Sequence, residues 1–388
     1  MVAQVLAMSK SRVRLLGCAF VVALLTLSCA NRSPFEGTDG GGTTDITAGP
    51  CKNGETRCDG QRYQRCDRGS FIDLQKCPSN STCAKDVGCV DCDPALPSGC
   101  RDNNVHACNK NGSIGAEQKK CLGLICAAGQ CTYPPCALGS KLIYVVDRKH
   151  NLLAFDPNKE TNHFRLIKRL TCGAQVGSTP FSMSIDRSAR AWVLYLSGEV
   201  FWVSTKNGDC QKSPYQTNQG GYQVFGMGFV ANSPGSNAER LFVSRADASL
   251  NPTAIRELGV VDPATLTLKP LAKMGNTEYS PELTGTGNAE LYGYYPGSTS
   301  SFVAKLDQKT GQQIQKWPVP AVPGVSAWAF AHWGGKFYIF VTSQELFAPE
   351  KSQVLRLDPA TGKTITFLPS IPYQIVGAGV STCAPVID

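Results

Sequence analysis

Histidine and charged side chains are scarce in this chain of 388 residues. Its four histidines lie far apart, so neither a Ser-His-Asp triad nor a histidine-based metal site can be assembled from them with any specificity. Charged residues make up only 18% of the chain, and the basic ones are scattered, which argues against nucleic acid as a partner despite a net charge of +8. The 38 glycines and 24 prolines instead indicate a turn-rich, all-β protein.

Long hydrophobic runs are also lacking, with one exception near the N-terminus. The run LLGCAFVVALLTLS (residues 15–28) follows three basic residues and is too short to span a bilayer comfortably. We interpret residues 1–28 as an export signal. The signal ends in TLSC, which resembles the lipobox of bacterial lipoproteins, although Thr26 stands where that family usually carries Leu. The resemblance implies that Cys29 is lipidated; the alternative is an ordinary cleaved signal in which Cys29 is incidental.

Residues 29–50 comprise this cysteine and a stretch rich in Gly, Thr and Asp without periodicity, which is typical of a flexible tether. The residue after Cys29 is Ala30, whereas an Asp at this position would resemble an inner-membrane retention signal. We therefore expect sorting to the outer membrane, on its periplasmic or cell-surface side. We further expect a monomer that is held at the membrane by its lipid alone, because no other apolar stretch reaches transmembrane length.

Sixteen cysteines remain after Cys18 and Cys29 are set aside, and an even number in an exported chain indicates disulfides. Twelve of them form two aligned sets, which predicts tandem modules at residues 51–91 and 92–135. Modules of about 40 residues with few large apolar side chains need covalent cross-links to be stable. We therefore expect three disulfides in each module and leave their pairing open. The alternative, a zinc site at CVDC, straddles the module boundary and lacks a second cysteine pair. The pattern resembles Cys-rich repeats on envelope lipoproteins of gliding Gram-negative bacteria, which implies a stalk or binding role.

Residues 136–388 carry a second repeat, in which aromatic and aliphatic residues form strand-like segments. Each copy has an inner segment whose second and fourth positions are small. These segments are FSMSID (181–186), FGMGFV (225–230), LTGTGN (283–288), WAFAHW (328–333) and VGAGVS (376–381). Small residues on one face suit strands that crowd together near a central axis. Further strands and turns of the type Asp-Pro-x-Thr-Gly follow, and four antiparallel strands per copy predict the blades of a β-propeller.

The two ends of this region predict how the ring closes. The first copy lacks its inner strand, whereas residues 376–381 have no blade behind them, so together they complete a five-bladed β-propeller with Velcro-type closure. Cys136, just before the first strand, and Cys383, just after the last, would then be neighbours, and we predict a disulfide between them. Cys172 and Cys210 remain to pair with each other.

The blade sequences, such as LIYVVD…LLAFDP and VLRLDPATGK, resemble the quinoprotein-like and YVTN-like β-propellers. This resemblance covers residues 137–388 and implies the fold only. The tryptophan docking motifs of the cofactor-binding members are not evident, so we expect no cofactor.

The loops that lead into the inner strands are expected to line one face of the ring. They carry five candidates for an aromatic and amide surface, which are Tyr222, Gln223, Tyr279, Trp328 and Tyr373. The alternative for Trp328 and Tyr373 is a structural role as wedges between blades. We predict a lipid-anchored binding or scaffolding protein whose propeller recognises a polysaccharide or another envelope protein.

The alternative function is a carbohydrate-active enzyme, either a glycosidase or a lyase. Its candidate acids are Asp186, Glu278 and Glu282, and such chemistry needs paired carboxylates about 5 Å or about 6.5–9.5 Å apart. Only one of the five inner segments carries an acid, so we assign no catalytic residue and expect no metal. Convergence of the three acids at one channel mouth would favour the enzyme.

Overall fold

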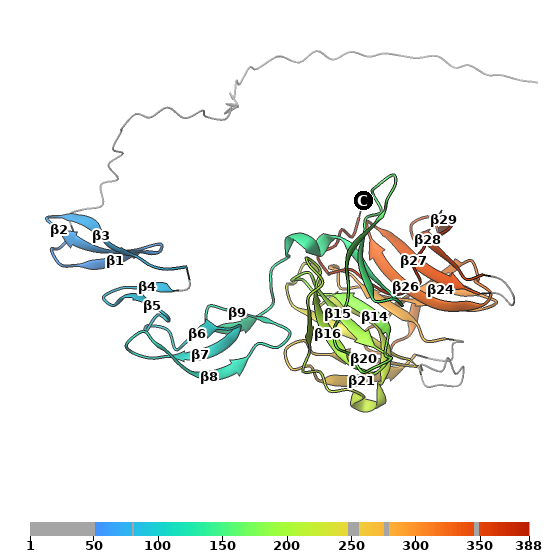
Figure 1. Ribbon diagram of the computed structural model, residues 1–388, viewed down its shortest axis with the longest axis horizontal. Coiled ribbons are helices and arrows are strands. Elements are labelled where there is room, and N and C mark those ends of the chain that lie inside the picture. The colour runs from blue at the N-terminus through green and yellow to red at the C-terminus, as the bar shows by residue number, and fades with distance from the viewer. Residues whose placement is uncertain (1–50, 80, 247–255, 275–278, 345–348, 388) are drawn as a thin grey trace, which may run out of the picture. The chain divides into compact units, whose positions relative to one another are not determined.

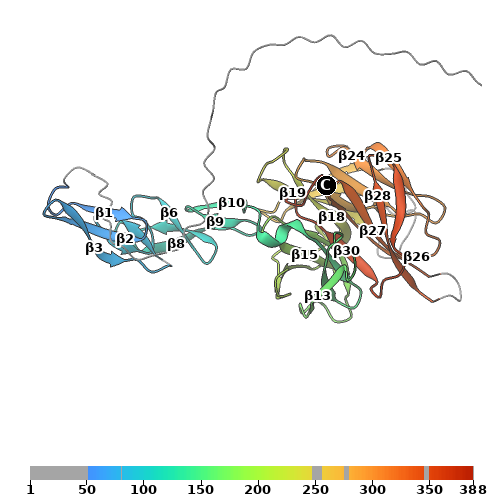
Figure 2. The ribbon, with the colours of Figure 1, turned by 90° about the horizontal axis from the view of Figure 1, so that it is seen from above.

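The computed structural model describes residues 51–387, apart from residue 80 and residues 247–255, 275–278 and 345–348. The chain divides into two units, residues 1–50 and 51–388. The predicted signal, Cys29 and the tether fall in the first unit and lie outside the described residues. The described chain is all-β, with two short 3₁₀ helices, η1 (Leu138–Lys141) and η2 (Gln219–Gly221) (Figures 1 and 2). Neither of these helices is long and apolar enough to cross a bilayer.

Each cysteine-rich module folds into a three-stranded antiparallel sheet followed by a two-stranded one. The strands of the first module are β1 (Thr56–Asp59), β2 (Arg62–Asp67), β3 (Ser70–Lys76), β4 (Thr82–Ala84) and β5 (Gly88–Val90). Those of the second are β6 (Ser98–Arg101), β7 (Asn104–Cys108), β8 (Ile114–Lys120), β9 (Ile125–Ala127) and β10 (Gln130–Thr132). The repeated order of strands follows the repeated spacing of the cysteines.

Three disulfides staple each module. In the first module they join Cys51 to Cys66, Cys58 to Cys83 and Cys77 to Cys89. In the second they join Cys92 to Cys108, Cys100 to Cys126 and Cys121 to Cys131. Both modules pair the first cysteine with the third, the second with the fifth and the fourth with the sixth. Because both cysteines of the CVDC segment are in disulfides, this segment is not a zinc site.

Five four-stranded antiparallel sheets make up the rest of the described chain. Four of them are consecutive: β14 (Pro180–Ile185), β15 (Arg190–Tyr195), β16 (Val200–Ser204) and β17 (Cys210–Lys212); β18 (Val224–Ala231), β19 (Glu239–Ala246), β20 (Glu257–Val261) and β21 (Leu268–Lys273); β22 (Glu282–Gly285), β23 (Leu291–Tyr295), β24 (Ser301–Leu306) and β25 (Gln313–Val319); β26 (Val325–Trp333), β27 (Lys336–Ser343), β28 (Lys351–Asp358) and β29 (Lys363–Leu368). The fifth joins both ends of the region: β30 (Ile375–Gly379), β11 (Ile143–Asp147), β12 (Asn151–Phe155) and β13 (Phe164–Arg169).

The inner strands of the five sheets follow one another in a circle. Strand β14 contacts β18 and β30, β22 contacts β18 and β26, and β26 contacts β30, so each inner strand has two inner neighbours. A Cβ atom added to Gly228 would lie 2.8 Å from Thr284 Cα, and one added to Gly379 would lie 2.8 Å from Ser184 Cα. The small residues of the repeat are therefore required because neighbouring backbones approach closely. The resulting fold is β-propeller-like and all-β.

The apolar core lies between successive sheets rather than at the centre of the ring. One buried cluster joins Trp192 and Leu194 to Phe225 and Val243, and equivalent clusters fill the other four interfaces. Each sheet thus buries both of its faces, which explains why its middle strands are hydrophobic on both sides.

The aspartates of the repeated turns have a structural role. The carboxylates of Asp156, Asp262, Asp307 and Asp358 each accept a hydrogen bond from the backbone N–H two residues ahead, at 2.8–3.0 Å. Ser204 Oγ accepts the equivalent bond in the remaining sheet. These are Asx-type turns, so the repetition of aspartate reflects turn chemistry and not catalysis.

Both predicted disulfides of this region are present. Cys136 bonds to Cys383, and Cys172 bonds to Cys210. The first bond lies next to the pairing of β11 with β30, where Tyr144 is opposite Gly379. It therefore ties the last strand of the chain to the segment that precedes the first strand of this sheet.

Candidate functional site

The beginnings of the five inner strands surround a cavity of about 180 Å³. Every inner strand contributes to its wall, through Pro180, Gly226, Glu282, Ala327 and Val376. This is the end of the ring to which the connecting loops lead. The position agrees with the sequence-based expectation that these loops line one face.

The wall of the cavity is mainly apolar, with one cation and one acid. Phe181, Leu196 and Trp328 supply large apolar surfaces. Trp328 is half-buried and packs against the ring of Tyr279, with 5.5 Å between the ring centroids. Arg148 lines the cavity from the turn between β11 and β12, where its Nη2 donates to the carbonyl oxygen of Ser326 at 3.4 Å.

Glu282 is the acid of this cavity, and its side chain is almost completely buried. Its Oε1 accepts hydrogen bonds from Ser182 Oγ and from the backbone N–H of Met227, the latter at 3.1 Å. Burial removes the carboxylate from water and raises the pKa of Glu282 to about 8, which outweighs the lowering effect of these hydrogen bonds. At neutral pH this group is therefore mostly a neutral carboxyl.

The structure brings one of the five predicted binding residues, Trp328, into the cavity wall. Tyr279 contributes indirectly, because it supports the Trp328 ring. Gln223 is exposed, and its Nε2 donates to the carbonyl oxygen of Ser197 at 2.8 Å outside the cavity. Tyr373 packs against Phe164, with 5.3 Å between ring centroids, which matches the alternative role as a wedge.

The prediction for Tyr222 was wrong, because its side chain is fully buried. The ring lies against Gly259 of β20, where an added Cβ would lie 3.2 Å from two ring carbons and from the hydroxyl oxygen of Tyr222. Because Gly259 has no side chain, β20 leaves room for the ring of Tyr222, which comes from the loop before β18. Tyr222 belongs to the apolar core and cannot contact a ligand.

The candidate acids of the alternative function do not converge. Asp186 follows the last residue of β14, whereas Glu282 contacts Ser182 near the beginning of that strand. Four residues of extended chain span about 13 Å, which exceeds the separations used in glycoside hydrolysis. Glu278 lies outside the described residues. The two described candidates, Asp186 and Glu282, are therefore too far apart to act as a catalytic pair.

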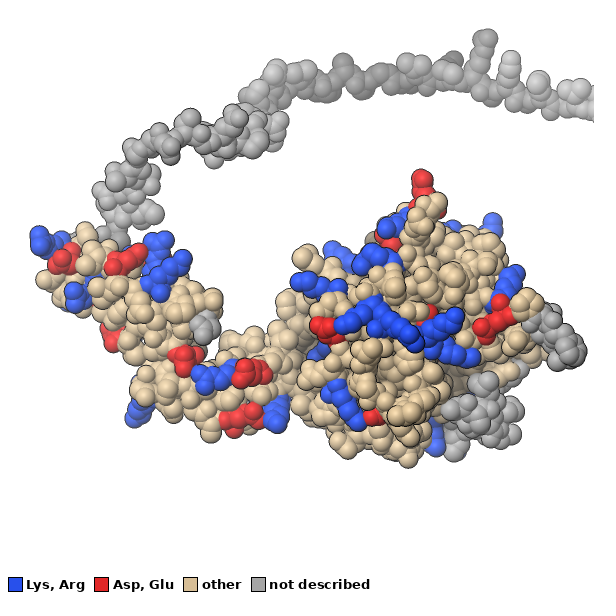
Figure 3. Space-filling model, in the orientation of Figure 1, with Lys and Arg blue, Asp and Glu red and all other residues tan. Residues whose placement is uncertain are grey.

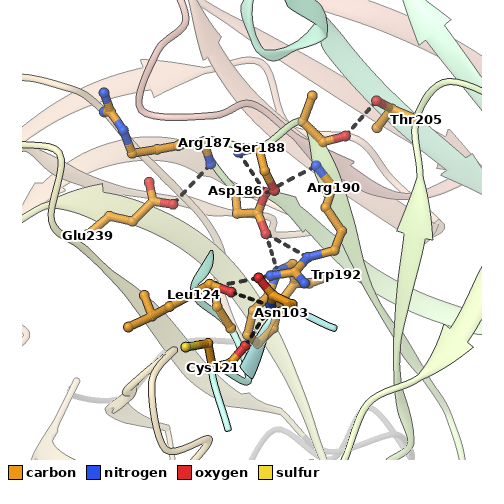
Figure 4. Close-up of polar contacts among 12 residues, drawn as sticks. Asn103, Cys121, Leu124, Asp186, Arg187, Ser188, Arg190, Trp192, Thr205 and Glu239 are labelled. Carbon is orange, nitrogen blue, oxygen red and sulfur yellow. Dashed lines mark hydrogen bonds and ion pairs between the residues drawn. The ribbon is translucent and has the colours of Figure 1, made fainter. Parts of the chain in front are cut away.

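Asp186 is fully engaged in a structural network, which Figure 4 shows. Its carboxylate accepts hydrogen bonds from Arg190 Nε at 2.8 Å and from Trp192 Nε1 at 2.9 Å, and it forms an ion pair with Arg190. Arg190 Nη2 also donates to the carbonyl oxygen of Gly123, which belongs to the second cysteine-rich module. These contacts indicate that Asp186 holds the fold together rather than acting on a substrate.

Sequence reasoning missed a second buried network beside Asp186. The guanidinium of Arg187 donates to Asn237 Oδ1 at 2.8 Å and to Thr382 Oγ1 at 3.0 Å, and its backbone N–H donates to Glu239 Oε1 at 3.0 Å. Burial raises the pKa of Glu239 to about 8. Nothing in the local sequence marks these residues, because their partners lie about 50 or more positions away. Arg148 was missed for a different reason: it lies in a polar turn that looks like ordinary surface.

No group of three or more His, Cys, Asp or Glu side chains in the described part of the chain could hold a metal ion. No protein-family model matches the chain, and no curated protein matches its sequence.

Solved structures resemble the chain only remotely. Hydrazine synthase from Kuenenia stuttgartiensis is 11% identical, with 61% of this chain and 68% of that chain covered and a TM-score of 0.33. A chain of the nidogen/laminin complex is 11% identical, with 61% and 97% covered and a TM-score of 0.39. The α-L-arabinofuranosidase CtGH43 from Clostridium thermocellum is 13% identical, with 51% and 71% covered and a TM-score of 0.35. All three TM-scores are below 0.5, so the function has to be argued from the residues of this chain.

Proposed function

We propose that this chain is a lipid-anchored protein of the cell envelope with a five-bladed propeller as its binding head. The five four-stranded sheets are then the blades, and the pairing of β30 with β11 closes the ring. The two disulfide-stapled modules form a stalk, and Cys29 carries the lipid that holds the protein at the outer membrane. A Cys29→Ser variant is expected to leave the membrane fraction, and a variant that stays there would contradict the anchor.

The head binds a polysaccharide through the cavity at the centre of the ring. The observation that carries this proposal is the cavity itself, whose apolar wall includes Trp328 and Phe181 and whose ionisable side chains are Arg148 and Glu282. A volume of about 180 Å³ is below the range of about 300–1,000 Å³ that is usual for whole drug-sized ligands. It suits a single ring of a longer chain, with an aromatic face for stacking and polar groups for the hydroxyls.

One observation favours the alternative, a glycosidase or lyase. A buried carboxyl with a pKa of about 8, such as Glu282, has the protonation state of a general acid at neutral pH. The required partner carboxylate is not among the described residues that line the cavity. Binding without turnover is therefore the better-supported function.

The decisive experiment measures retention and cleavage together. The oxidised, unlipidated chain from Asn31 onward is incubated with a panel of bacterial and plant polysaccharides and, separately, with isolated envelope proteins. Retention of the protein on each polymer and release of soluble fragments are recorded, the latter by mass spectrometry. Retention without fragments is the expected result. Fragments that disappear in Glu282→Gln would establish the enzyme instead, and retention only on isolated envelope proteins would replace the polysaccharide by a protein partner.

Two aromatic variants test whether the cavity is the binding site. Trp328→Ala should abolish retention, because it removes the stacking face from the cavity wall. Tyr373→Ala is the matched control, since Tyr373 is also a half-buried aromatic residue close to an inner strand but lies outside the cavity. Equal loss of retention in both variants would argue against binding in the cavity.

A further inference from the structure

A second hollow, lined only by polar and cationic side chains, adjoins the central cavity. Its lining consists of Arg148, Lys149, His150, Asn151 and Arg169. The first three residues form the turn between β11 and β12, Asn151 begins β12, and Arg169 ends β13 directly opposite Asn151 in the sheet register. The positive φ of 69° at His150 forms this tight turn, in which the backbone N–H of His150 donates to the carbonyl oxygen of Asp147.

Among the described residues, no ion pair uses the positive charges of this hollow. Arg148, Lys149 and Arg169 are exposed. The acid of the turn, Asp147, is buried, and its two carboxylate oxygens accept hydrogen bonds from the backbone and side-chain nitrogens of Asn151 at 2.8 Å.

A second carboxylate, Glu350, lies beside Ser326, whose carbonyl oxygen accepts a hydrogen bond from Arg148. Its Oε1 accepts a hydrogen bond from Gln374 Nε2 at 2.5 Å and another from Ser326 Oγ at 3.4 Å. These bonds occupy the carboxylate without using any of the three cations. The hollow thus keeps its cations available for a negatively charged ligand.

The hollow and the central cavity are joined through one residue. Arg148 lines both of them, and Lys149 and Arg169 are among the other residues that line the hollow. Figure 3 shows Lys and Arg side chains gathered across the middle of the visible face of residues 136–388. Arginine binds planar oxyanions through paired hydrogen bonds, and such contacts are stronger than those to neutral hydroxyls.

We propose that the hollow formed by Arg148, Lys149 and Arg169 is an anion subsite, and that the ligand of the head is an acidic polysaccharide. A carboxylate or sulfate on the residue next to the ring in the cavity binds these cations. This inference rests on the proposed function, because it assigns the ligand class of the same site. It predicts that a neutral polysaccharide binds much more weakly than an acidic polymer with the same backbone.

The test compares polymers that differ in charge alone. The full mature chain is run in affinity gels that contain polygalacturonate, its carboxyl-reduced neutral form, dextran sulfate or unmodified dextran. We expect retention by polygalacturonate at low ionic strength, at least tenfold weaker retention by the carboxyl-reduced polymer, and a decline with added salt. Retention by dextran sulfate but not by polygalacturonate would identify sulfate as the anion instead of carboxylate.

Three charge variants locate the effect. Arg148→Gln/Arg169→Gln should weaken retention at least tenfold, and Arg148→Lys/Arg169→Lys should restore part of it, because the charge is kept while the paired geometry is lost. Lys269→Gln/Lys363→Gln removes two exposed charges from other sheets and should behave like the unmodified chain. Equal weakening by this control, or equal retention by single-stranded DNA, would reveal nonspecific charge attraction and overturn the proposal.

The outcomes separate this inference from the proposed function. Equal binding of the neutral and acidic polymers, with loss in Trp328→Ala, would leave the binding cavity standing and overturn the anion subsite. Binding that depends on Arg148 and Arg169 but not on Trp328 would support the anion subsite and contradict the proposal that the ligand occupies the cavity. Retention by none of the four polymers would overturn the acidic-polysaccharide ligand, and the wider polysaccharide panel would then decide the proposed function.

Discussion

Breaking the disulfide between Cys136 and Cys383 should destabilise the propeller-like domain more than breaking the one between Cys172 and Cys210. The change is the double substitution of each pair by serine. Serine is preferred to alanine because Arg187 Nη2 donates to Cys136 Sγ at 3.2 Å, and a hydroxyl oxygen can accept that bond. The pairing of β11 with β30 stays intact in the native state, so the effect arises mainly in the unfolded chain.

The expected magnitudes follow from the lengths of the closed loops. The first disulfide joins residues 247 positions apart and the second joins residues 38 positions apart. The chain-entropy relation then gives losses of about 5.5 kcal/mol and about 3.9 kcal/mol, a difference of about 1.6 kcal/mol. The difference is the more useful quantity, because native-state effects common to both pairs cancel in it.

Equilibrium unfolding in urea without reductant measures these losses. All five tryptophans of the chain lie between residues 192 and 333, so their fluorescence reports on the propeller-like domain and not on the stapled modules. The dependence of the unfolding free energy on urea should keep a similar slope in both variants. A loss in the Cys136/Cys383 variant that is equal to or smaller than that in the Cys172/Cys210 variant would refute the reasoning.

Three further predictions concern buried residues. Because the pKa of Glu282 rises from 4.5 to about 8 on folding, this carboxyl stabilises the fold below pH 4.5, and that contribution is lost as the pH rises toward 8. Glu282→Gln should therefore weaken the decrease of the unfolding free energy with rising pH between about pH 5 and pH 8. An unchanged slope of this free energy against pH would contradict the burial argument. Gly228→Ala places a Cβ 2.8 Å from Thr284 Cα and should cost about 3 kcal/mol, whereas an unchanged thermal midpoint would show that the inner strands can separate freely. Arg187→Met should cost about 1.5–3 kcal/mol in urea unfolding, because it removes the hydrogen bonds from this guanidinium to the buried Thr382 and to Asn237. The exposed Arg165→Met should stay within about 0.5 kcal/mol, and equal losses would remove the special role of Arg187.

Features that depend on neighbours in the chain could be predicted from the sequence. The aspartates of the repeated turns bond to backbone N–H groups two residues ahead, so their pattern is visible locally. The spacing of the cysteines revealed two modules, but only the structure chose one of the possible pairings in each. The alternation of small residues in the inner segments predicted crowded strands, and Gly228 and Gly379 show the close backbone contacts that cause it.

Features that depend on contacts across the ring were decided by the tertiary structure alone. Tyr222 and Trp328 are both aromatic residues near the beginning of an inner strand, yet one fills a space beside Gly259 and the other lines the cavity. Glu282 meets Ser182 across 100 positions of sequence, and its raised pKa comes from that burial. The sequence by itself thus determined the repeating units and their turns, because these rest on short-range chemistry. The site depended on which side chains the neighbouring inner strands bring together, and no local pattern encodes that.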